Sequence, residues 1–410
     1  MIEMKLTQIA YNGLALGRSN GKVYFVPYAL PGERVMIELV KEKKDWAYAK
    51  LNQVIDPSPH RITPTCPYFG PSGCGGCHWQ HIDYGAQLEF KSQIVRDQLI
   101  RIGGLKTPKV KPASPVGLQW GYRNHVQFHP VLDGWGFVAA KKNDVIKISQ
   151  CPLLPPVLND LFQQIKVENK GLNKLSLRAG LKTGSKLIIV ESRENVLIKT
   201  DSFLQASFVQ VFPDKTYYVH EGKDHIYEGI EGLNIRVSRQ SFFQVNTDGA
   251  EYLVKLVRNY LALAGKEIIL DLYSGVGLFS LCLAYEVRRV IAVESLPAAV
   301  KDFRFNIRSQ KIKNILVHQK FVGTFLKEFK ERVDAVVLDP PRRGCGPNII
   351  KELARLSPQR IVYVSCDPAT LARDSGYLRA SGYHLMEAQP LDFFPQTYHI
   401  ETVALFVREV

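Results

Sequence analysis

The feature that most constrains the fold is a regular alternation of apolar runs and amphipathic stretches from about residue 248 onward. Short β-branched segments are separated by stretches with helical periodicity; the segments read EIILDLY, RVIAVE, NILVHQ, DAVVLDPP and RIVYVSCDP. Strands that alternate with helices predict a doubly wound α/β sheet of mainly parallel strands. Ligands of such sheets bind at the carboxyl ends of the strands, so the candidate site is expected there.

A glycine loop follows the first of these predicted strands. Residues 271–280 read DLYSGVGLFS, and Gly275 and Gly277 would let the backbone approach a ligand closely. Glu294 ends the next strand, where an acid is placed to bind ribose hydroxyls. Ser280 stands where the third glycine of a nicotinamide-type loop would be. We therefore favour S-adenosylmethionine, a nucleoside ligand without pyrophosphate, over NAD.

Cys366 and Glu401 are the candidate catalytic residues. Cys366 ends an apolar strand just before a predicted helix, a position that can lower a thiol pKa and create a nucleophile, although a buried structural cysteine is the commoner case. Glu401 is a carboxylate within the apolar segment HIETVALF, and burying a carboxylate costs free energy unless it has a partner or a catalytic role. The segment 339–343 ends the preceding strand and should meet Cys366. Cys345, in a Gly-Pro loop, is the weaker candidate nucleophile.

Together, these residues suggest methylation of a pyrimidine carbon in RNA. C5 of uracil becomes nucleophilic when a thiolate adds to C6, and a base must then remove the C5 proton. Cys366 and Glu401 would take these two roles. The net charge of +14, from 53 Lys and Arg against 39 Asp and Glu, suits a polyanionic partner. Arg123 and Asn124, in GYRNHVQFHP, are candidate RNA contacts, unless this segment is simply a strand with a polar face.

Composition and the positions of Gly and Pro residues divide the chain into three predicted parts. Residues 1–56 contain short β-branched runs separated by Gly and Pro and predict a small β-barrel. Residues 57–240 predict a mainly β domain with helices over 83–103 and near 153–166, and 241–410 form the α/β domain. No apolar run approaches the roughly 18 residues of a membrane span, and the N-terminus lacks signal-peptide features. We expect a cytoplasmic protein without membrane association.

Four cysteines in the central part have the spacing of a metal site. Cys66, Cys74, Cys77 and Cys151 would supply four thiolates, which suit either zinc or a [4Fe–4S] cluster, and spacing alone does not choose. Radical enzymes that use S-adenosylmethionine leave one iron open by providing three cysteines. Four ligands would close the cluster, so a structural role is expected.

The chain resembles the RNA uracil-5-methyltransferases, especially the branch that modifies 23S ribosomal RNA and carries a TRAM domain and an iron–sulfur cluster. The resemblance extends over nearly the whole chain. It rests on five segments: VSCDPATLARD (364–374) with HIETVALF (399–406), QSFFQVN (240–246), DLYSGVGLFSL (271–281), LDPPRRG (338–344) and FVPYALPGERV (25–35). It implies a Rossmann-like methyltransferase domain, an OB-like TRAM barrel that binds RNA, and a [4Fe–4S] cluster on the four cysteines.

The resemblance also implies roles for individual residues. Cys366 would be the nucleophile and Glu401 the base, and Phe242 would stack on the flipped uracil. S-adenosylmethionine would be bound by Gln244, Tyr273, Glu294 and Asp339. The helix over 83–103 would pack on the catalytic domain.

Three positions depart from the family pattern. Leu278 replaces an Asn of some members, HQKF lacks an acid after the third strand, and seven residues rather than five separate Cys66 from Cys74. The substrate also stays open, with 23S rRNA favoured over the tRNA T-loop. Two further hypotheses fit the sequence less well: cytosine-C5 methylation, and a non-catalytic RNA-binding or ribosome-assembly protein. A monomer is expected.

Overall fold

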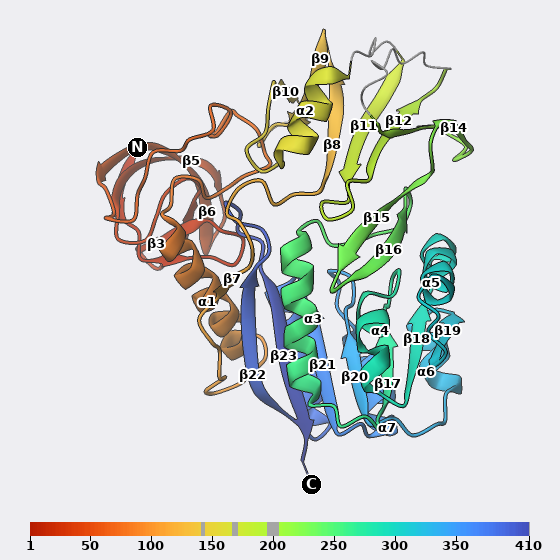
Figure 1. The fold of residues 1–410 in the computed structure, drawn as a ribbon. Helices are drawn as coiled ribbons and strands as arrows, with labels where there is room; N and C mark the ends of the chain where they lie inside the picture. The colour runs from red at the N-terminus through yellow and green to blue at the C-terminus, as the bar shows by residue number, and fades with distance from the viewer. Residues whose placement is uncertain (141–143, 166–170, 195–204, 410) are drawn as a thin grey trace.

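The computed structural model describes residues 1–140, 144–165, 171–194 and 205–409, in three successive β-rich regions (Figure 1). The C-terminal sheet has eight strands in the order β19-β18-β17-β20-β21-β23-β22-β7. Its strands are β7 (Ser114–Pro115), β17 (Ile268–Leu272), β18 (Arg289–Glu294), β19 (Ile315–Gln319), β20 (Ala335–Leu338), β21 (Arg360–Ser365), β22 (Tyr383–Asp392) and β23 (Glu401–Arg408). Strands β17 to β21 are mutually parallel, which confirms the predicted doubly wound arrangement. Strand β23 runs antiparallel to both of its neighbours, β21 and β22.

Helices cover both faces of this sheet, because the apolar strands are buried on both sides. The helices that follow residue 246 are α3 (Thr247–Leu261), α4 (Leu278–Leu283) with a 3-10 turn (Ala284–Glu286), α5 (Pro297–Ser309), α6 (Val322–Glu328), α7 (Gly346–Leu356) and α8 (Pro368–Ala380). One core contains α3, α4 and α5, and the other contains α6, α7 and α8.

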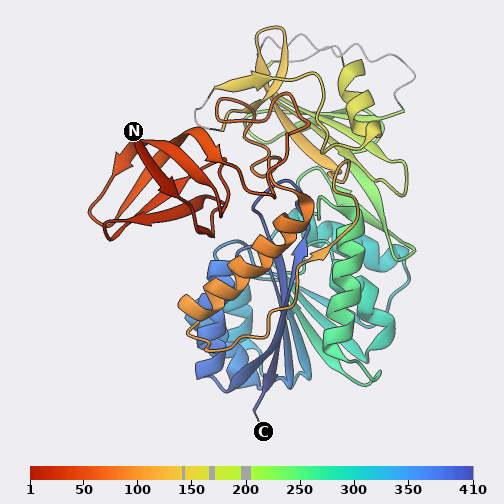
Figure 2. The ribbon, with the colours of Figure 1, turned by 90° about the vertical axis from the view of Figure 1, so that its left-hand side faces the viewer.

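Helix α1 (Tyr84–Arg101) belongs to the second of these cores although it comes from the middle of the chain. Asp83 caps it by accepting a hydrogen bond from the Ala86 amide at 3.0 Å. Phe90, Ile94 and Leu99 recur at helical spacing and are buried, and the helix packs against α8 and β22. Figure 2 shows this orange helix lying along the C-terminal domain. The sequence prediction of a helix over 83–103 is therefore confirmed.

The central sheet has seven strands in the order β10-β9-β8-β11-β12-β13-β14. Its strands are β8 (His125–Val131), β9 (Gly134–Val138), β10 (Val145–Lys147), β11 (Leu172–Ala179), β12 (Lys186–Ser192), β13 (Ser207–Val211) and β14 (Tyr217–Glu221), with α2 (Pro156–Gln164) packed on it. The pairing is antiparallel except between β12 and β13. A separate hairpin of β15 (His225–Ile230) and β16 (Leu233–Ser238) lies between this sheet and the C-terminal one (Figure 1).

The N-terminal sheet, residues 2–56, has six strands in the order β1-β5-β6-β4-β3-β2. The strands are β1 (Ile2–Lys5), β2 (Gln8–Ile9), β3 (Ala15–Ser19), β4 (Lys22–Val26), β5 (Arg34–Glu42) and β6 (Trp46–Asp56). The sheet curls around a small core that includes Leu6, Val35 and Ile37, so that β1 approaches β3. No helix in the described ranges is long and apolar enough to cross a membrane.

Candidate active site

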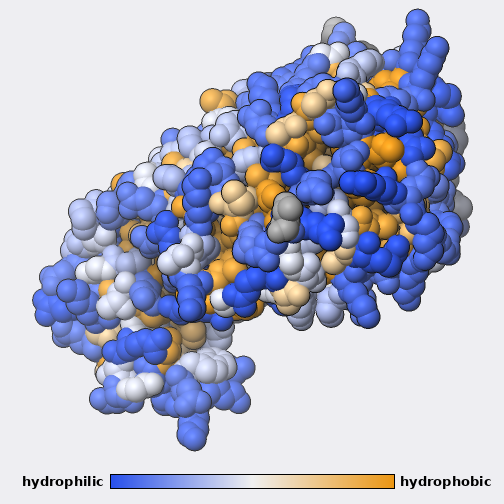
Figure 3. Space-filling view, turned by 90° about the horizontal axis from the view of Figure 1, so that it is seen from below, coloured by the Kyte–Doolittle hydropathy of each residue, from blue (hydrophilic) through white to orange (hydrophobic). Residues whose placement is uncertain are grey.

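The loops after β17, β18, β20 and β21 gather at the end of the C-terminal sheet that faces the central sheet (Figure 1). This is the edge where a doubly wound sheet binds its ligands. Figure 3 shows the opposite end of the molecule, where hydrophilic side chains surround apolar ones. The candidate site is at the other end of the C-terminal sheet, the end that faces the central sheet.

The glycine loop forms a tight turn into α4. Tyr273, Gly275 and Gly277 have φ of 66°, 55° and 98°. A Cβ at Gly277 would overlap the ring of Phe303, so position 277 requires glycine for both conformation and space. The Gly275 amide donates to Glu294 Oε2 at 2.9 Å, which ties the loop to the end of β18.

The loop encloses a small cavity lined by four of the predicted cofactor residues: Gln244, Tyr273, Gly275 and Asp339. A second cavity of about 160 Å³ adjoins it at Tyr273 and is lined by Glu294 and Phe321. Gly277 lines neither cavity; it shapes the turn from behind. All predicted cofactor residues except Gly277 therefore line these two cavities, which share Tyr273.

Asp271, the first residue of the segment DLYSGVGLFS and one that the sequence did not assign to the site, lies beneath the glycine loop. It is fully buried at the end of β17, and the Ser280 amide and hydroxyl both donate to its Oδ2, at 3.1 and 2.5 Å. Desolvation raises the pKa of Asp271 to about 6. Desolvation, assisted by the charge of Asp271, raises the pKa of Asp339 to about 7. Two carboxyl groups with raised pKa values therefore lie beside the glycine loop.

Cys366 and Glu401 are brought together by the antiparallel pairing of β21 with β23. The last aligned pair is Ser365 with Thr402, so the next step along the ladder sets Cys366 beside Glu401. Asp367 then caps α8 by accepting a hydrogen bond from the Thr370 amide at 2.8 Å. Strand, cysteine and helix cap are thus consecutive, as the sequence predicted.

The electrostatics of this pair differ from expectation. Burial raises the pKa of Cys366 to about 12, and the charges of Glu401 and Asp339 act in the same direction. The position before a helix had suggested a lowered thiol pKa; that prediction was wrong because desolvation and nearby carboxylates outweigh the helix terminus. Burial and Asp339 likewise raise the pKa of Glu401 well above its usual range. Arg342 lowers the pKa of both groups, so its guanidinium is the cation that favours their ionised forms.

The other two cysteines of the C-terminal region have different surroundings. Cys282 is buried in α4 within the apolar core. Burial raises the pKa of Cys345 to about 12, and its thiol contacts the hydroxyls of Tyr363 and Tyr273. Glu401 is among the charges that act on the Cys366 thiol, whereas the leading influences on Cys282 and Cys345 come from other residues.

The four cysteines of the central region line one cavity of about 470 Å³, shared with Phe242, Arg123 and Gln80. Burial raises the pKa of Cys77 to about 12 and of Cys151 to about 11, and the charges of the other cysteines add to both shifts. Among the residues that the structure describes, no three His, Cys, Asp or Glu side chains converge into a group that would itself hold a metal ion. The four thiols therefore share one cavity, but within the described residues they do not form a metal-binding group, so the expected four-thiolate site is not shown.

Phe242 connects the two regions. Its side chain is 67% exposed and lines both the cysteine cavity and the cofactor cavity. Arg123 lines the cysteine cavity and donates from Nε to the His125 carbonyl at 3.0 Å. Asn124 is different: it is buried, and its amide donates to the Gln244 carbonyl and to Thr247 Oγ1, at 3.1 and 3.0 Å. These internal bonds contradict the expectation that Asn124 contacts RNA.

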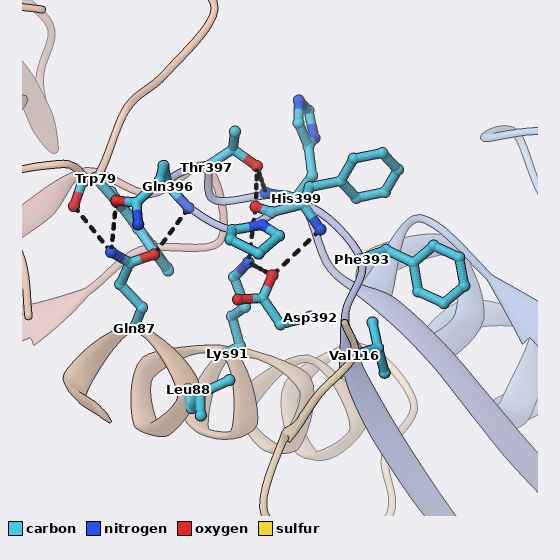
Figure 4. A network of polar contacts seen from close by, with 12 residues as sticks. Trp79, Gln87, Leu88, Lys91, Val116, Asp392, Phe393, Gln396, Thr397 and His399 are labelled. Carbon is cyan, nitrogen blue, oxygen red and sulfur yellow. Dashed lines mark hydrogen bonds and ion pairs between the residues drawn. The ribbon is translucent and has the colours of Figure 1, made fainter. Parts of the chain in front are cut away.

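A polar network holds the segment that leads to Glu401 (Figure 4). Lys91 of α1 and Asp392 at the end of β22 are both fully buried and meet at 2.5 Å. Gln87 donates to Gln396 Oε1 at 3.1 Å and accepts from the Gln396 amide at 3.0 Å. Sequence analysis missed these residues, because a lysine inside an amphipathic helix ordinarily faces water and its partner lies 301 positions away.

Comparison with known proteins matches these features. A model of the tRNA (Uracil-5-)-methyltransferase family matches residues 222–409. An uncharacterized RNA methyltransferase of Thermotoga maritima is 34% identical over 99% of this chain and 99% of its own. One from Synechocystis is also 34% identical, over 99% of this chain and 95% of its own. The chain belongs to the RNA uracil-5-methyltransferase family.

The fold of this RNA uracil-5-methyltransferase family member is also that of a solved enzyme. The crystal structure of Pyrococcus abyssi tRNA (uracil-54, C5)-methyltransferase in complex with S-adenosyl-L-homocysteine has 27% sequence identity and a TM-score of 0.78, and the match covers 99% of this chain and 100% of that one. The family assignment confirms an S-adenosylmethionine-dependent RNA methyltransferase and the predicted Rossmann-like α/β fold.

Proposed function

We propose that the protein methylates C5 of a uracil in structured RNA, with Cys366 as nucleophile and Glu401 as base. The observation that carries the proposal is the register of β21 and β23, which sets a thiol beside a buried carboxyl. Asp339, which lines the cofactor cavity, acts electrostatically on both groups. A nucleophile and a base side by side are what addition to C6 and removal of the C5 proton require.

The chemistry follows from the positions of these groups. The Cys366 sulfur adds to C6 and makes C5 nucleophilic; C5 then takes the methyl group, Glu401 removes the C5 proton, and the sulfur leaves C6. S-adenosylmethionine, when bound, supplies the methyl group from a sulfonium centre. The thiol must first lose its proton, and the Arg342 guanidinium favours that loss. Burial shields the Glu401 carboxyl from water and raises its pKa, and a raised pKa makes it a stronger base for removing a proton from carbon.

The cofactor would lie in the two adjoining cavities beside the glycine loop. Gln244, Tyr273, Gly275 and Asp339 would contact it in the first cavity, and Glu294 would bind ribose hydroxyls in the second. Gly277 would act indirectly, by allowing the turn to pass Phe303.

Phe242 would stack on the flipped uracil, since it is an exposed aromatic ring between the cofactor cavity and the central sheet. Arg123 would contact RNA near it. The N-terminal sheet would act as the RNA-binding TRAM barrel, and the proposed domains are 1–56, 57–240 and 241–410.

The cysteine cavity would hold a structural [4Fe–4S] cluster on Cys66, Cys74, Cys77 and Cys151. Protein purified without oxygen should be brown and contain about four iron atoms per chain. Cys66→Ser should lower the iron content, whereas Cys282→Ser, at a buried cysteine outside the cavity, should not. Zinc in place of iron would overturn this assignment.

The substrate we favour is 23S ribosomal RNA, on the likeness of the sequence motifs to that branch. A tRNA uridine is the second candidate, because the Pyrococcus abyssi enzyme whose architecture is shared over the whole chain is a tRNA (uracil-54, C5)-methyltransferase. Incubation with S-adenosylmethionine labelled in its methyl group, separately with unmodified 23S rRNA and with tRNA, followed by nucleoside analysis, separates them. Label in 5-methyluridine of rRNA alone supports the first, and of tRNA alone the second. Label in 5-methylcytidine, or no transfer to either RNA, would refute the proposed reaction.

A further inference from the structure

The loop between β2 and β3 of the N-terminal sheet reaches the candidate active site. The Tyr11 hydroxyl donates a hydrogen bond to Asp367 Oδ2, so two segments 356 positions apart meet next to Cys366. Arg342 also lies in the electrostatic environment of the Tyr11 hydroxyl. The charged group that affects both catalytic residues thus has Tyr11 among its neighbours.

On the C-terminal side of Tyr11, the same loop packs closely against Trp79 and Tyr398 through Gly13. The Gly13 carbonyl accepts a hydrogen bond from Trp79 Nε1 at 3.0 Å. Gly13 has a φ of 79°, and a Cβ there would lie 2.5 Å from the Tyr398 Cβ, so only glycine fits against that side chain. Tyr398 stands three residues before Glu401. The same loop therefore contacts the segments that carry the candidate nucleophile and the candidate base.

Asp367 is held at both of its carboxylate oxygens. Oδ1 accepts from the Thr370 amide at 2.8 Å, which caps α8, and Oδ2 accepts from Tyr11. The Asp367 carbonyl accepts from the Ser365 hydroxyl at 3.0 Å. Because Cys366 lies between Ser365 and Asp367, these bonds fix the backbone on both sides of the thiol. Without the Tyr11 hydroxyl, one carboxylate oxygen would be released beside Cys366.

We propose that Tyr11 is a positioning residue for the nucleophile, through which the N-terminal sheet fixes the Cys366 segment. This inference rests on the proposed function, since it takes Cys366 as the reacting thiol. It predicts that docking of the N-terminal sheet sets the rate of the chemical step rather than only the affinity for RNA.

The charges around the thiol give the direction of the effect on its ionisation. Glu401 from β23, Asp339 from the loop after β20 and Asp367 all raise the pKa of Cys366, and Arg342 lowers it. A hydrogen bond from Tyr11 withdraws charge from Asp367. Loss of that hydroxyl should therefore make the thiol ionise at higher pH.

The test is a double-mutant cycle with Tyr11→Phe and Asp367→Asn, because Asn caps a helix as well as Asp does. Tyr11→Phe should lower kcat about 10-fold with unchanged RNA affinity, the low end for a hydrogen bond to a charged group. In the Asp367→Asn background the same change should have less than about a 2-fold effect. Tyr217→Phe is the matched control, since Tyr217 also donates to an aspartate, Asp224, at 3.3 Å but lies on β14. Equal effects in both backgrounds, or a change in RNA affinity alone, would overturn the proposal.

A second readout does not depend on methyl transfer. The rate of Cys366 alkylation by iodoacetamide, followed by mass spectrometry of its peptide, should rise with pH along a curve that Tyr11→Phe moves to higher pH. Tyr217→Phe should leave the curve in place. A shifted curve in a protein that transfers no methyl group would refute the proposed function, although Tyr11 would still act on the Cys366 thiol. An unshifted curve in an active protein would refute the positioning role alone.

Discussion

The buried pair of Lys91 and Asp392 gives a prediction whose size follows from the structure. Both side chains have no exposed surface, and Lys91 also donates to the Phe394 carbonyl at 3.2 Å. Lys91→Met would leave the Asp392 carboxylate buried with the Phe394 amide, at 3.2 Å, and the Tyr84 hydroxyl as hydrogen-bond donors, and without a cation. Removing one partner of a buried ion pair costs about 3–5 kcal/mol, because an uncompensated charge remains out of water. The double change Lys91→Met with Asp392→Asn should recover most of that loss.

Urea unfolding followed by circular dichroism measures this effect, as a shift of the midpoint of the transition that includes the C-terminal domain. Arg101→Met is the matched control on the same helix: its partner is Asp97 at 3.7 Å, and the two side chains are 57% and 43% exposed. An exposed pair of this kind should contribute less than about 1 kcal/mol. A Lys91→Met variant no less stable than Arg101→Met would refute the reasoning. So would a double variant less stable than Lys91→Met.

Three further predictions concern the glycine loop and Asp339. Gly277→Ala should destabilise the fold by at least about 2 kcal/mol in thermal or urea unfolding, because it adds strain and an overlap with Phe303; Gly275→Ala, where the added Cβ meets open space, should cost about 1 kcal/mol or less. Cofactor affinity measured by titration calorimetry should rise between pH 6 and pH 8, because Asp339, with a pKa of about 7, becomes a carboxylate that attracts a sulfonium cation. The same raised pKa means that the ligand-free fold loses stability as pH rises from the ordinary aspartate range toward 7, since the unfolded chain ionises Asp339 first. Asp339→Asn should flatten both dependences, and an affinity independent of pH in the unaltered protein would contradict them.

The C-terminal fold was predictable because its signals are local. Each parallel strand is a short apolar run, each helix has its own periodicity, and the glycine loop and Glu294 follow consecutive strands. The sequence also singled out both Cys366, at the end of a predicted strand, and Glu401, a carboxylate within an apolar segment. What the sequence did not indicate was that β23 inserts between β21 and β22 and runs antiparallel to both. That insertion is what pairs the two residues.

The remaining features depend on contacts between distant segments. Desolvation of Cys366 comes from the packing of loops around it, so a rule based on the following helix gave the wrong direction for its pKa. Asn124 belongs to a polar segment that suggested a surface position, but its side chain is buried and donates hydrogen bonds to Gln244 and Thr247. No sequence motif marked Tyr11 as part of the site, because its hydrogen-bond partner Asp367 lies 356 positions away in the chain.

The most direct test of uracil-C5 chemistry at Cys366 is mass spectrometry of RNA adducts formed by the Glu401→Gln variant with S-adenosylmethionine. The account predicts a denaturant-resistant complex in which the peptide containing Cys366 carries a methylated uridine, because C5 has been methylated but its proton cannot be removed. The Cys366→Ala, Glu401→Gln double variant should form none. An adduct at Cys345, or a Cys366→Ala enzyme that still makes 5-methyluridine, would contradict it.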